Sequence, residues 1–220
     1  MKVVIVEDHL MFREVLRKVC AEDLGLVVAG EAGDGRSAVP LVIETQPDLV
    51  LLDLHLPGLD GFGVVAALRH ARPEQRILIL SSHCDNHTVF RVERARVQGF
   101  VDKNTSAVSS LKQAIAAVIA GQTYFSEAFR QVKAARIEDP FSFDKMLSDR
   151  ECATLALIGA PLTDAEIAER LQISRGTAEK HRFNIMNKLG LKTHTQLVRY
   201  AVEHGFTLSS GRGGDGAMLP

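Results

Sequence analysis

Asp53 closes an apolar run, Asp48-Leu-Val-Leu-Leu-Asp53, and a turn-rich segment follows it. A carboxylate at the end of a fully apolar strand is costly to bury unless it has a partner. Three more strand-like runs end in polar residues, at Glu7 and Asp8, at Ser81, and at Lys103. If these strands are parallel, their ends meet at one edge of a sheet. That edge then gathers three carboxylates, a hydroxyl and an ammonium group.

These side chains have the chemistry of a metal-assisted phosphoryl site. A hard divalent cation resolves the repulsion among Glu7, Asp8 and Asp53, and Mg2+ suits a site that leaves room for water and phosphate. Lys103 supplies a positive charge for phosphate, and the Ser81 hydroxyl can donate to a phosphoryl oxygen. A carboxylate flanked by a metal and a lysine can act as a nucleophile. We therefore expect the central residue, Asp53, to form an aspartyl phosphate.

Alternating strands and helices must position these residues. Apolar runs predict strands at 2–6, 26–31, 48–53, 76–81 and 99–102. Helical patterns lie between them, near 9–22, 35–45, 61–71, 86–96 and 107–120. This alternation predicts an α/β domain over 1–121 with a doubly wound, five-stranded parallel sheet. In such sheets, ligands bind at the carboxyl ends of the strands, where the polar residues lie.

The alternation stops after residue 121. We interpret residues 122–146 as an interdomain linker with some helix at 126–137, in which Phe141 and Phe143 pack on a domain. Residues 207–220 contain four glycines and two serines and predict a disordered tail.

Residues 147–206 predict a small all-α domain of four helices. Capping boxes, in which two side chains satisfy backbone donors reciprocally, are predicted at Ser148/Glu151, Thr163/Glu166 and Thr193/Gln196. Ser174 is a fourth candidate N-cap. The expected helices are 149–159, 164–171, 175–189 and 194–204, with C-terminal glycines at Gly159, Gly190 and Gly205.

Two of these helices, 164–171 and 175–189, are separated only by Gln172-Ile173-Ser174. A helix, a short turn and a helix form a DNA-binding arrangement in which the second helix enters the major groove. Residues 175–192 carry five basic residues against one acidic residue. Ala178, Ile185 and Leu189 predict a buried stripe. The outward residues include phosphate-binding Arg175 and candidate base-reading residues, Lys180, Arg182 and Asn184.

Composition limits the other classes of function. The 220 residues have a formal net charge of -1, so total charge gives no sign of nucleic-acid binding. Cys20, Cys84 and Cys152 are too far apart for a metal-ligand motif, and we expect reduced thiols. No apolar run approaches the roughly 20 residues that span a membrane, and no segment resembles a signal peptide. We expect a soluble, cytoplasmic protein.

The first domain resembles the receiver domain of bacterial response regulators. The resemblance depends on Glu7-Asp8, Asp53 with its following turn through Gly61, Ser81 and Lys103. It implies a flavodoxin-like fold and phosphotransfer from a histidine kinase to Asp53. It also implies Mg2+ bound by Asp8 and Asp53, with Glu7 assisting and the His55 carbonyl contributing. Ser81 and Phe100 match the hydroxyl and aromatic switch positions of the family, although Phe100 also suits a strand core.

The helical domain resembles the LuxR-type helix-turn-helix, so the whole chain resembles a NarL/FixJ-class response regulator. The motif residues include Leu147 to Glu151, Glu166-Ile167-Ala168, Thr177, His181 and Lys188-Leu189-Gly190. The resemblance implies double-stranded DNA as a partner and a homodimer when phosphorylated. The candidate DNA-binding residues are Arg175, Thr177, Glu179, Lys180, His181, Arg182, Asn184, Lys188 and Lys192.

Several residues depart from the family patterns. Asn104 replaces a frequent proline, Arg96-Val97 replaces Gly-Ala, and Ala178-Glu179 replaces the usual residues after the threonine. His55 and His83 lie two residues beyond Asp53 and Ser81, where they either tune hydrolysis and its pH dependence or form a solvated rim.

Two alternative functions stay open beside a non-enzymatic regulator. One is a protein-interaction module with weakened DNA binding, for which Glu179 and Arg96-Val97 are the observations. The other is an aspartyl-phosphate phosphatase of the haloacid dehalogenase type. That class needs a second aspartate two residues after the nucleophile, where this chain has His55.

Overall fold

The structure is a computed structural model that describes residues 1–160 and 162–206. The predicted tail at 207–220 lies outside the described residues. Two compact units are present, one formed by residues 1–84 and 91–131 and the other by residues 85–90 and 132–206.

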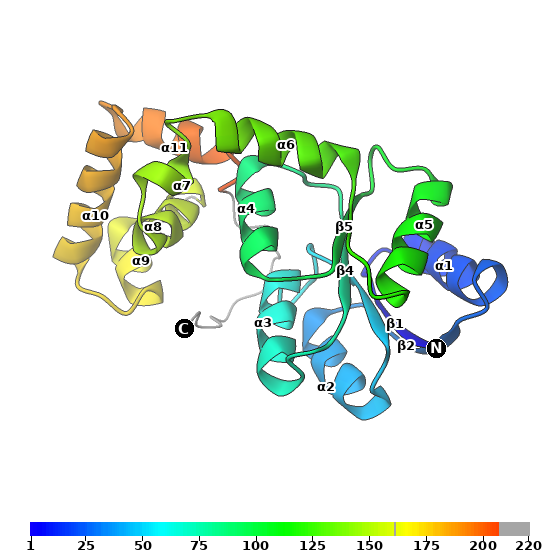
Figure 1. Cartoon of the computed structure of the whole chain (residues 1–220). Helices are drawn as coiled ribbons and strands as arrows, with labels where there is room; N and C mark the ends of the chain where they lie inside the picture. Colours follow the sequence, from blue (N-terminus) through cyan, green and yellow to red (C-terminus); the bar gives the residue numbers. More distant parts are fainter. Residues whose placement is uncertain (161, 207–220) are drawn as a thin grey trace. The chain divides into compact units, whose positions relative to one another are not determined.

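The first unit contains one parallel sheet, with strand order β2-β1-β3-β4-β5-β6 (Figure 1). Its strands are β1 Lys2–Val6, β2 Val27–Ala32, β3 Leu49–Asp53, β4 Ile77–Ser81, β5 Gly99–Asp102 and β6 Tyr124–Phe125. The predicted α/β fold is therefore confirmed, with all five expected strands. The sixth strand lies inside the predicted linker. This strand has only two residues, which is too few to produce a periodic sequence pattern.

Helices cover both faces of this sheet. They are α1 Leu10–Lys18, continued by a π-helical segment Val19–Asp23, α2 Gly35–Thr45, α3 Gly61–Ala71, α4 Asn86–Arg94, whose first five residues belong to the second unit, and α5 Val108–Ile119. Figure 1 shows α1 and α5 on one face and α2 and α3 on the other. Every residue of β3 and β4 is buried. This double coverage explains why both strands are almost entirely apolar.

The register of the strands aligns their carboxyl ends. Val6 lies beside Leu52, and Asp53 lies beside Leu80. Ser81 pairs in turn with Asp102. The polar residues that end each strand are thus brought to one edge of the sheet.

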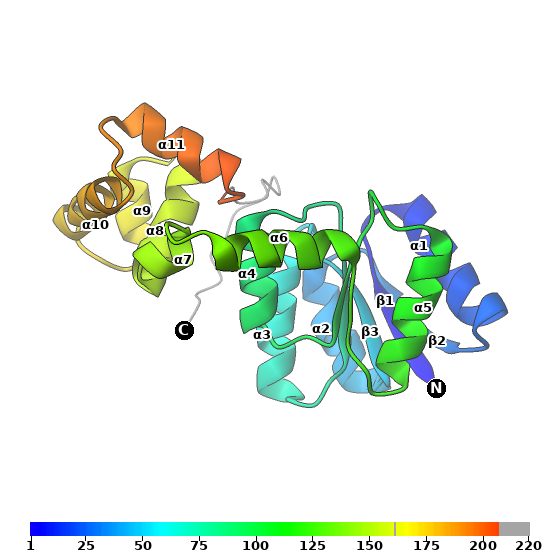
Figure 2. The same ribbon diagram turned by 45° about the horizontal axis from the view of Figure 1, so that its top comes forward.

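The second unit is helical, as predicted. Its helices are α6 Glu127–Glu138, which begins in the first unit, α7 Phe143–Met146, α8 Asp149–Gly159, α9 Asp164–Arg170, α10 Arg175–Lys188 and α11 His194–Glu203. Figure 2 shows α8, α9 and α10 packed together, with α11 against α8. Phe143, Leu155, Ile185 and Leu197 are among the residues of their shared core. No helix in the described ranges is both long and apolar enough to cross a membrane.

The predicted helix starts are confirmed. All three capping boxes form, and the Ser174 side chain accepts a hydrogen bond from the backbone of Thr177. Gly190 and Gly205 have the positive φ of C-terminal glycines, at 67° and 77°. Gly159 ends α8, as predicted, but it is the last helical residue and does not have a positive φ. A Cβ there would lie 2.2 Å from the backbone oxygen of Phe206, so close packing requires glycine.

The predicted linker contains the helix expected at 126–137, observed as α6. Its two phenylalanines differ. Phe143 is buried in the core of the second unit, but Phe141 is 73% exposed, so the expectation that both would pack on a domain was half wrong.

Candidate functional site

The strand ends bring the predicted acidic residues and the lysine together. The Lys103 ammonium lies 2.7 Å from Glu7 Oε2 and 2.8 Å from Asp53 Oδ2. Carboxylate oxygens of Glu7, Asp8 and Asp53 lie within 4.8 Å of one another. Residues separated by as many as 96 positions in the chain therefore form one cluster.

This cluster has more negative than positive charge. Glu7 and Asp53 are buried, Asp8 is exposed, and one ammonium group lies between the two buried carboxylates. Burial raises the pKa of Glu7, and nearby Asp53 raises it further, against the opposing hydrogen bond from Lys103. Three oxygen donors with one exposed member fit a divalent cation that keeps part of its water.

The loop after β5 fixes Lys103. Its backbone N–H donates to the Ser81 carbonyl at 2.8 Å, which extends the pairing of β4 and β5 by one residue. The buried Asp102 carboxylate accepts hydrogen bonds from the Asn104 backbone and the Thr105 hydroxyl, at 3.0 and 2.8 Å. These local bonds turn the chain so that the lysine points back over the strand ends.

The turn after β3 fixes Asp53. The His55 backbone N–H donates to Asp53 Oδ1 at 3.1 Å. Gly58 has φ +79°, a conformation that favours glycine. A Cβ on Gly61 would lie 2.3 Å from the Asp53 carbonyl oxygen. Only glycine lets α3 begin this close to the end of the strand.

His55 and His83 form a pair near this site. Their ring centroids are 4.2 Å apart, and Nδ1 of His55 is buried without a hydrogen-bond partner among the described residues. Burial lowers the pKa of His55, and the neighbouring His83 lowers it further. The backbone of His83 also donates to the buried Ser81 hydroxyl, at 3.1 Å. The solvated rim is thus correct for His83, which is exposed, but not for His55, which is partly buried. The matching offset from two strand ends was the sequence signal for the pair.

Phe100 belongs to the core of the first unit. It is fully buried in β5, and its ring centroid lies 5.1 Å from that of Phe129 in α6. Its aromatic partner lies in the segment predicted as a linker, so this contact could not be predicted from the strand and helix patterns.

The Arg96-Val97 departure has a clear backbone consequence. Arg96 follows α4 with φ 50°, in the left-handed region. Its carbonyl accepts a hydrogen bond from the Arg69 guanidinium at 3.0 Å. A residue with a side chain therefore occupies a conformation that glycine adopts at lower cost.

On α10, several predicted DNA-binding residues are engaged within the protein. The Arg182 guanidinium binds Asp164 through two nitrogens, at 3.1 and 2.8 Å. Lys188 binds Glu151 of the first capping box at 2.7 Å. Arg182 therefore has a partner within the protein, while its side chain is still 30% exposed, and its assignment to DNA stays a prediction.

The other predicted DNA-binding residues make fewer contacts with neighbouring helices. Arg175 pairs with Glu179 at 2.9 Å on the helix surface. Lys180 and Lys192 are exposed and have no ion pair within the described ranges. The Thr177 hydroxyl contacts Ser174 at 2.8 Å, and His181 and Asn184 are partly buried. As predicted, Ala178 and Ile185 are buried, and Leu189 packs against the same core.

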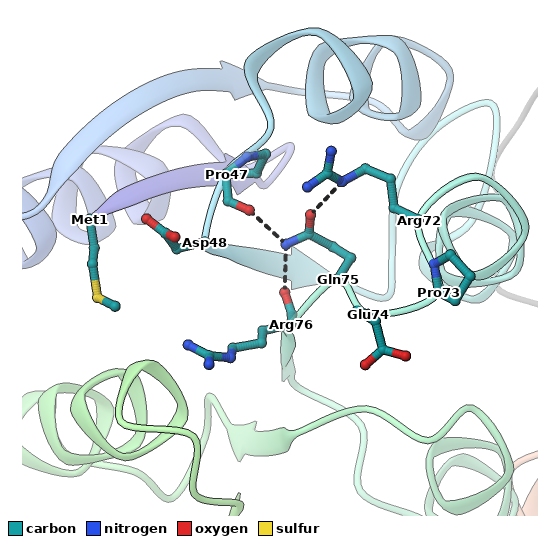
Figure 3. A pocket seen from close by; sticks show the side chains of 8 residues that line it. All are labelled: Met1, Pro47, Asp48, Arg72, Pro73, Glu74, Gln75 and Arg76. Carbon is teal, nitrogen blue, oxygen red and sulfur yellow. Dashed lines mark hydrogen bonds between the residues drawn. The ribbon is translucent and has the colours of Figure 1, made fainter.

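An open hollow lies at the opposite edge of the sheet, near the amino ends of β1, β3 and β4 (Figure 3). There the Gln75 amide donates to the carbonyls of Pro47 and Arg76, at 3.1 and 3.2 Å, and accepts from Arg72. These bonds hold the starts of two strands. None of the predicted site residues lines this hollow.

Comparison with known proteins gives two family matches. Residues 3–116 match the response regulator receiver domain, and residues 145–201 match the bacterial regulatory proteins of the LuxR family. The chain is 34% identical to the oxygen regulatory protein NreC of Staphylococcus aureus, over 92% of this chain and 97% of that protein. It is 30% identical to the fimbriae Z protein of Salmonella typhimurium, over 92% and 96%. Among solved structures, an RcsB–DNA complex matches with 25% identity, covers 92% of this chain and 98% of that one, and has a TM-score of 0.63.

Proposed function

Because the chain belongs to the response regulators, with a receiver domain followed by a LuxR-type domain, we propose that phosphorylation of Asp53 switches its binding to DNA. The observation that carries this proposal is the Lys103 ammonium between Glu7 and Asp53 at the strand ends. The proposed receiver domain is 1–121, the linker 122–146 and the DNA-binding domain 147–206.

The phosphoryl donor in this proposal is a phosphohistidine on a histidine kinase. A carboxylate oxygen of Asp53 forms a bond to phosphorus as the bond between phosphorus and the imidazole breaks. Lys103 holds the attacking carboxylate and then faces the added phosphate. Ser81 donates its hydroxyl hydrogen to a phosphoryl oxygen, and Phe100 responds as the aromatic switch residue.

The donor set fits Mg2+, with Asp8, Asp53 and the His55 carbonyl as ligands and Glu7 assisting. Bound Mg2+ supplies charge neutralisation for the phosphoryl oxygens. The exposed position of Asp8 supports this assignment because it leaves one side of the cluster open to water and phosphate.

The DNA-binding role rests on the second unit. The related RcsB has been solved in complex with DNA. Here Lys180 and Lys192 are the open cations, and we assign them to phosphates, with Arg175, Thr177, His181 and Asn184 beside them. Arg182 and Lys188 act mainly by holding α10 to its neighbours. A homodimer of the phosphorylated protein then presents two recognition helices to the DNA. We further propose that the protein works in the cytoplasm.

The two alternatives are less well supported. For a phosphatase, His55 stands where the second catalytic aspartate belongs. For an interaction module without DNA binding, Glu179 was the main observation. Its charge is balanced by Arg175 on the same helix face, so it is a weaker obstacle to DNA.

A gel-shift assay on genomic fragments, with and without acetyl phosphate and Mg2+, tests the proposal. We expect acetyl phosphate to label wild-type protein and to change its DNA affinity and oligomeric state. Asp53→Asn should abolish all three responses. Asp48→Asn is the matched control because it removes an exposed carboxylate at the other end of the same strand. Labelling without any change in DNA binding would contradict the switch.

A further inference from the structure

α10 carries an exposed aromatic residue that the predicted DNA-binding set did not include. The Phe183 residue is 63% exposed, although its helix buries Ala178 and Ile185 in the core of the second unit. A single exposed apolar residue is common on protein surfaces and carries no inference by itself. The residues around Phe183 therefore decide what it can bind.

Phe183 lies at the centre of one exposed helix face. Residues three or four positions apart are neighbours on the surface of a helix. The exposed residues of α10 that follow this spacing are Gly176, Lys180, Phe183 and Asn187. Ala178 and Ile185 lie on the opposite side of the helix, so this exposed face points away from the core.

The charge of this face favours a polyanion. Lys180, one turn before Phe183, has no ion pair within the described part of the chain. The only acidic residue in 175–192, Glu179, is matched by Arg175 at 2.9 Å. This helix face thus combines the exposed Lys180 ammonium group with the exposed ring of Phe183.

We propose that Phe183 reads thymine by packing against its C5-methyl group in the major groove. This inference rests on the proposed function, since it requires α10 to be the recognition helix. The thymine methyl is an apolar group on the major-groove edge, and a phenylalanine side chain can contact it. Lys180, on the same face, binds a neighbouring phosphate or a guanine edge. Phe183 then determines sequence preference, and Lys180 mainly determines affinity.

The test uses the full chain treated with acetyl phosphate and Mg2+. Binding sites are first selected from random duplex DNA, and each thymine of the selected site is then replaced by deoxyuridine, which lacks only the methyl group. We expect wild-type protein to lose about fourfold in affinity at one or more positions, the effect of one buried methyl-sized group. Phe183→Ala should bind the parent site more weakly and respond less than about twofold to the same replacements.

Control variants separate the proposed contact from other effects. Phe141→Ala removes another exposed phenylalanine, from outside the recognition helix, and should behave like wild type. Phe183→Leu keeps an apolar side chain and should keep part of the methyl sensitivity. Thermal unfolding of Phe183→Ala should match wild type, because the side chain is largely exposed. Lys180→Ala should reduce the salt dependence of binding, which Phe183→Ala should leave unchanged.

Three results would overturn the inference while leaving the proposed function intact. They are a wild-type protein that tolerates every deoxyuridine, a Phe183→Ala variant with undiminished methyl sensitivity, and a change in oligomeric state on Phe183→Ala without DNA. The last result would assign Phe183 to a contact between copies of the chain. If wild-type protein binds no DNA in any state, the proposed function itself fails.

Discussion

The charges at the end of the sheet and the charges on α10 are held in different ways. At the sheet, Lys103 contacts two buried carboxylates, and the register of the strands determines the positions of these groups. On α10, Arg182 and Lys188 bind acidic residues of other helices, and Lys180 stays open. Backbone geometry thus determines where the charged groups at the sheet edge lie. On α10, the packing of side chains determines which basic residues are paired and which stay exposed.

The two regions also differ in how much stability is lost when one member of an ion pair is removed. A buried charge without a partner is strongly destabilising, whereas a partly exposed ion pair contributes little. Substitutions at the sheet edge should therefore affect stability and phosphorylation together. On α10, substituting a residue that is paired within the protein should lower stability. Substituting an exposed residue without an ion pair should weaken DNA binding and leave stability unchanged.

The largest expected effect comes from Lys103→Met. This variant leaves Glu7 and Asp53 without their cation, and breaking a buried pair costs about 3 kcal/mol of unfolding free energy. Phosphorylation by acetyl phosphate should slow by about a hundredfold, as for loss of a preorganised charge. Urea unfolding and labelling rates measure the two effects. Mg2+ should restore part of the lost stability, because it binds the folded cluster.

Lys112→Met is the matched control for Lys103→Met. Lys112 pairs with Asp23 at 2.7 Å, and both side chains are more than one-third exposed. Its loss should cost less than about 1 kcal/mol and leave labelling unchanged. Equal stability losses in the two variants would contradict the contrast between buried and exposed pairs.

A second test compares Arg182→Ala with Lys180→Ala. Arg182 makes a two-nitrogen contact with Asp164, so its loss should lower the unfolding free energy by about 1 kcal/mol. Lys180→Ala should leave stability unchanged but weaken DNA binding and reduce its salt slope by about one. Urea unfolding and binding at several salt concentrations distinguish them. If Arg182→Ala reduces the salt slope at full stability, the sequence-based assignment of Arg182 to DNA was right.

These regions show which parts of the site could be predicted. Asp53, Glu7 and Lys103 follow from strand order, because parallel strands bring their carboxyl ends together. The pairing of Arg182 with Asp164 does not follow from periodicity, which identifies the buried stripe and cannot say which outward side chain meets a neighbouring helix. Phe183 was missed for a related reason. A basic residue signals DNA binding in a sequence and a phenylalanine does not, although the predicted buried stripe of Ala178 and Ile185 already placed Phe183 on the opposite face.

The helix starts were predictable because capping depends on residues three positions apart. Ser148/Glu151 and Thr163/Glu166 satisfy each other's backbone locally, so distant packing hardly affects them. β6 was not predictable, since its two residues become a strand only by pairing with β5. The departure at Arg96 was visible in the sequence, but its backbone conformation was not.

Arg96→Gly tests the departure at the end of α4, where the Arg96 carbonyl accepts a hydrogen bond from Arg69. Glycine adopts positive φ without the steric cost of a side chain, so we expect about 1 kcal/mol of stabilisation and a rise in Tm of about 2–4 °C. Thermal unfolding measures the change. As a control, His70→Gly introduces glycine at an exposed helical position of α3 and should lower stability by about 0.5–1 kcal/mol. Destabilisation by both variants would show that the Arg96 side chain itself is needed.

The smallest effect concerns pH and the Glu151–Lys188 pair. Burial alone would raise the pKa of Glu151, but hydrogen bonds from Lys188 and Ser148 outweigh it and hold the pKa below its usual range. A carboxyl group whose pKa is lower in the folded state stabilises the fold above its unfolded pKa and loses that effect as pH falls through the folded pKa. Glu151→Gln should therefore cost less than about 1 kcal/mol at pH 7. The difference in unfolding free energy between Glu151→Gln and wild type should vanish at acid pH. The exposed control, Glu203→Gln, should differ little from wild type at pH 7 or at acid pH. A Glu151→Gln deficit that persists unchanged at low pH would assign the role of Glu151 to the capping hydrogen bonds and not to its charge.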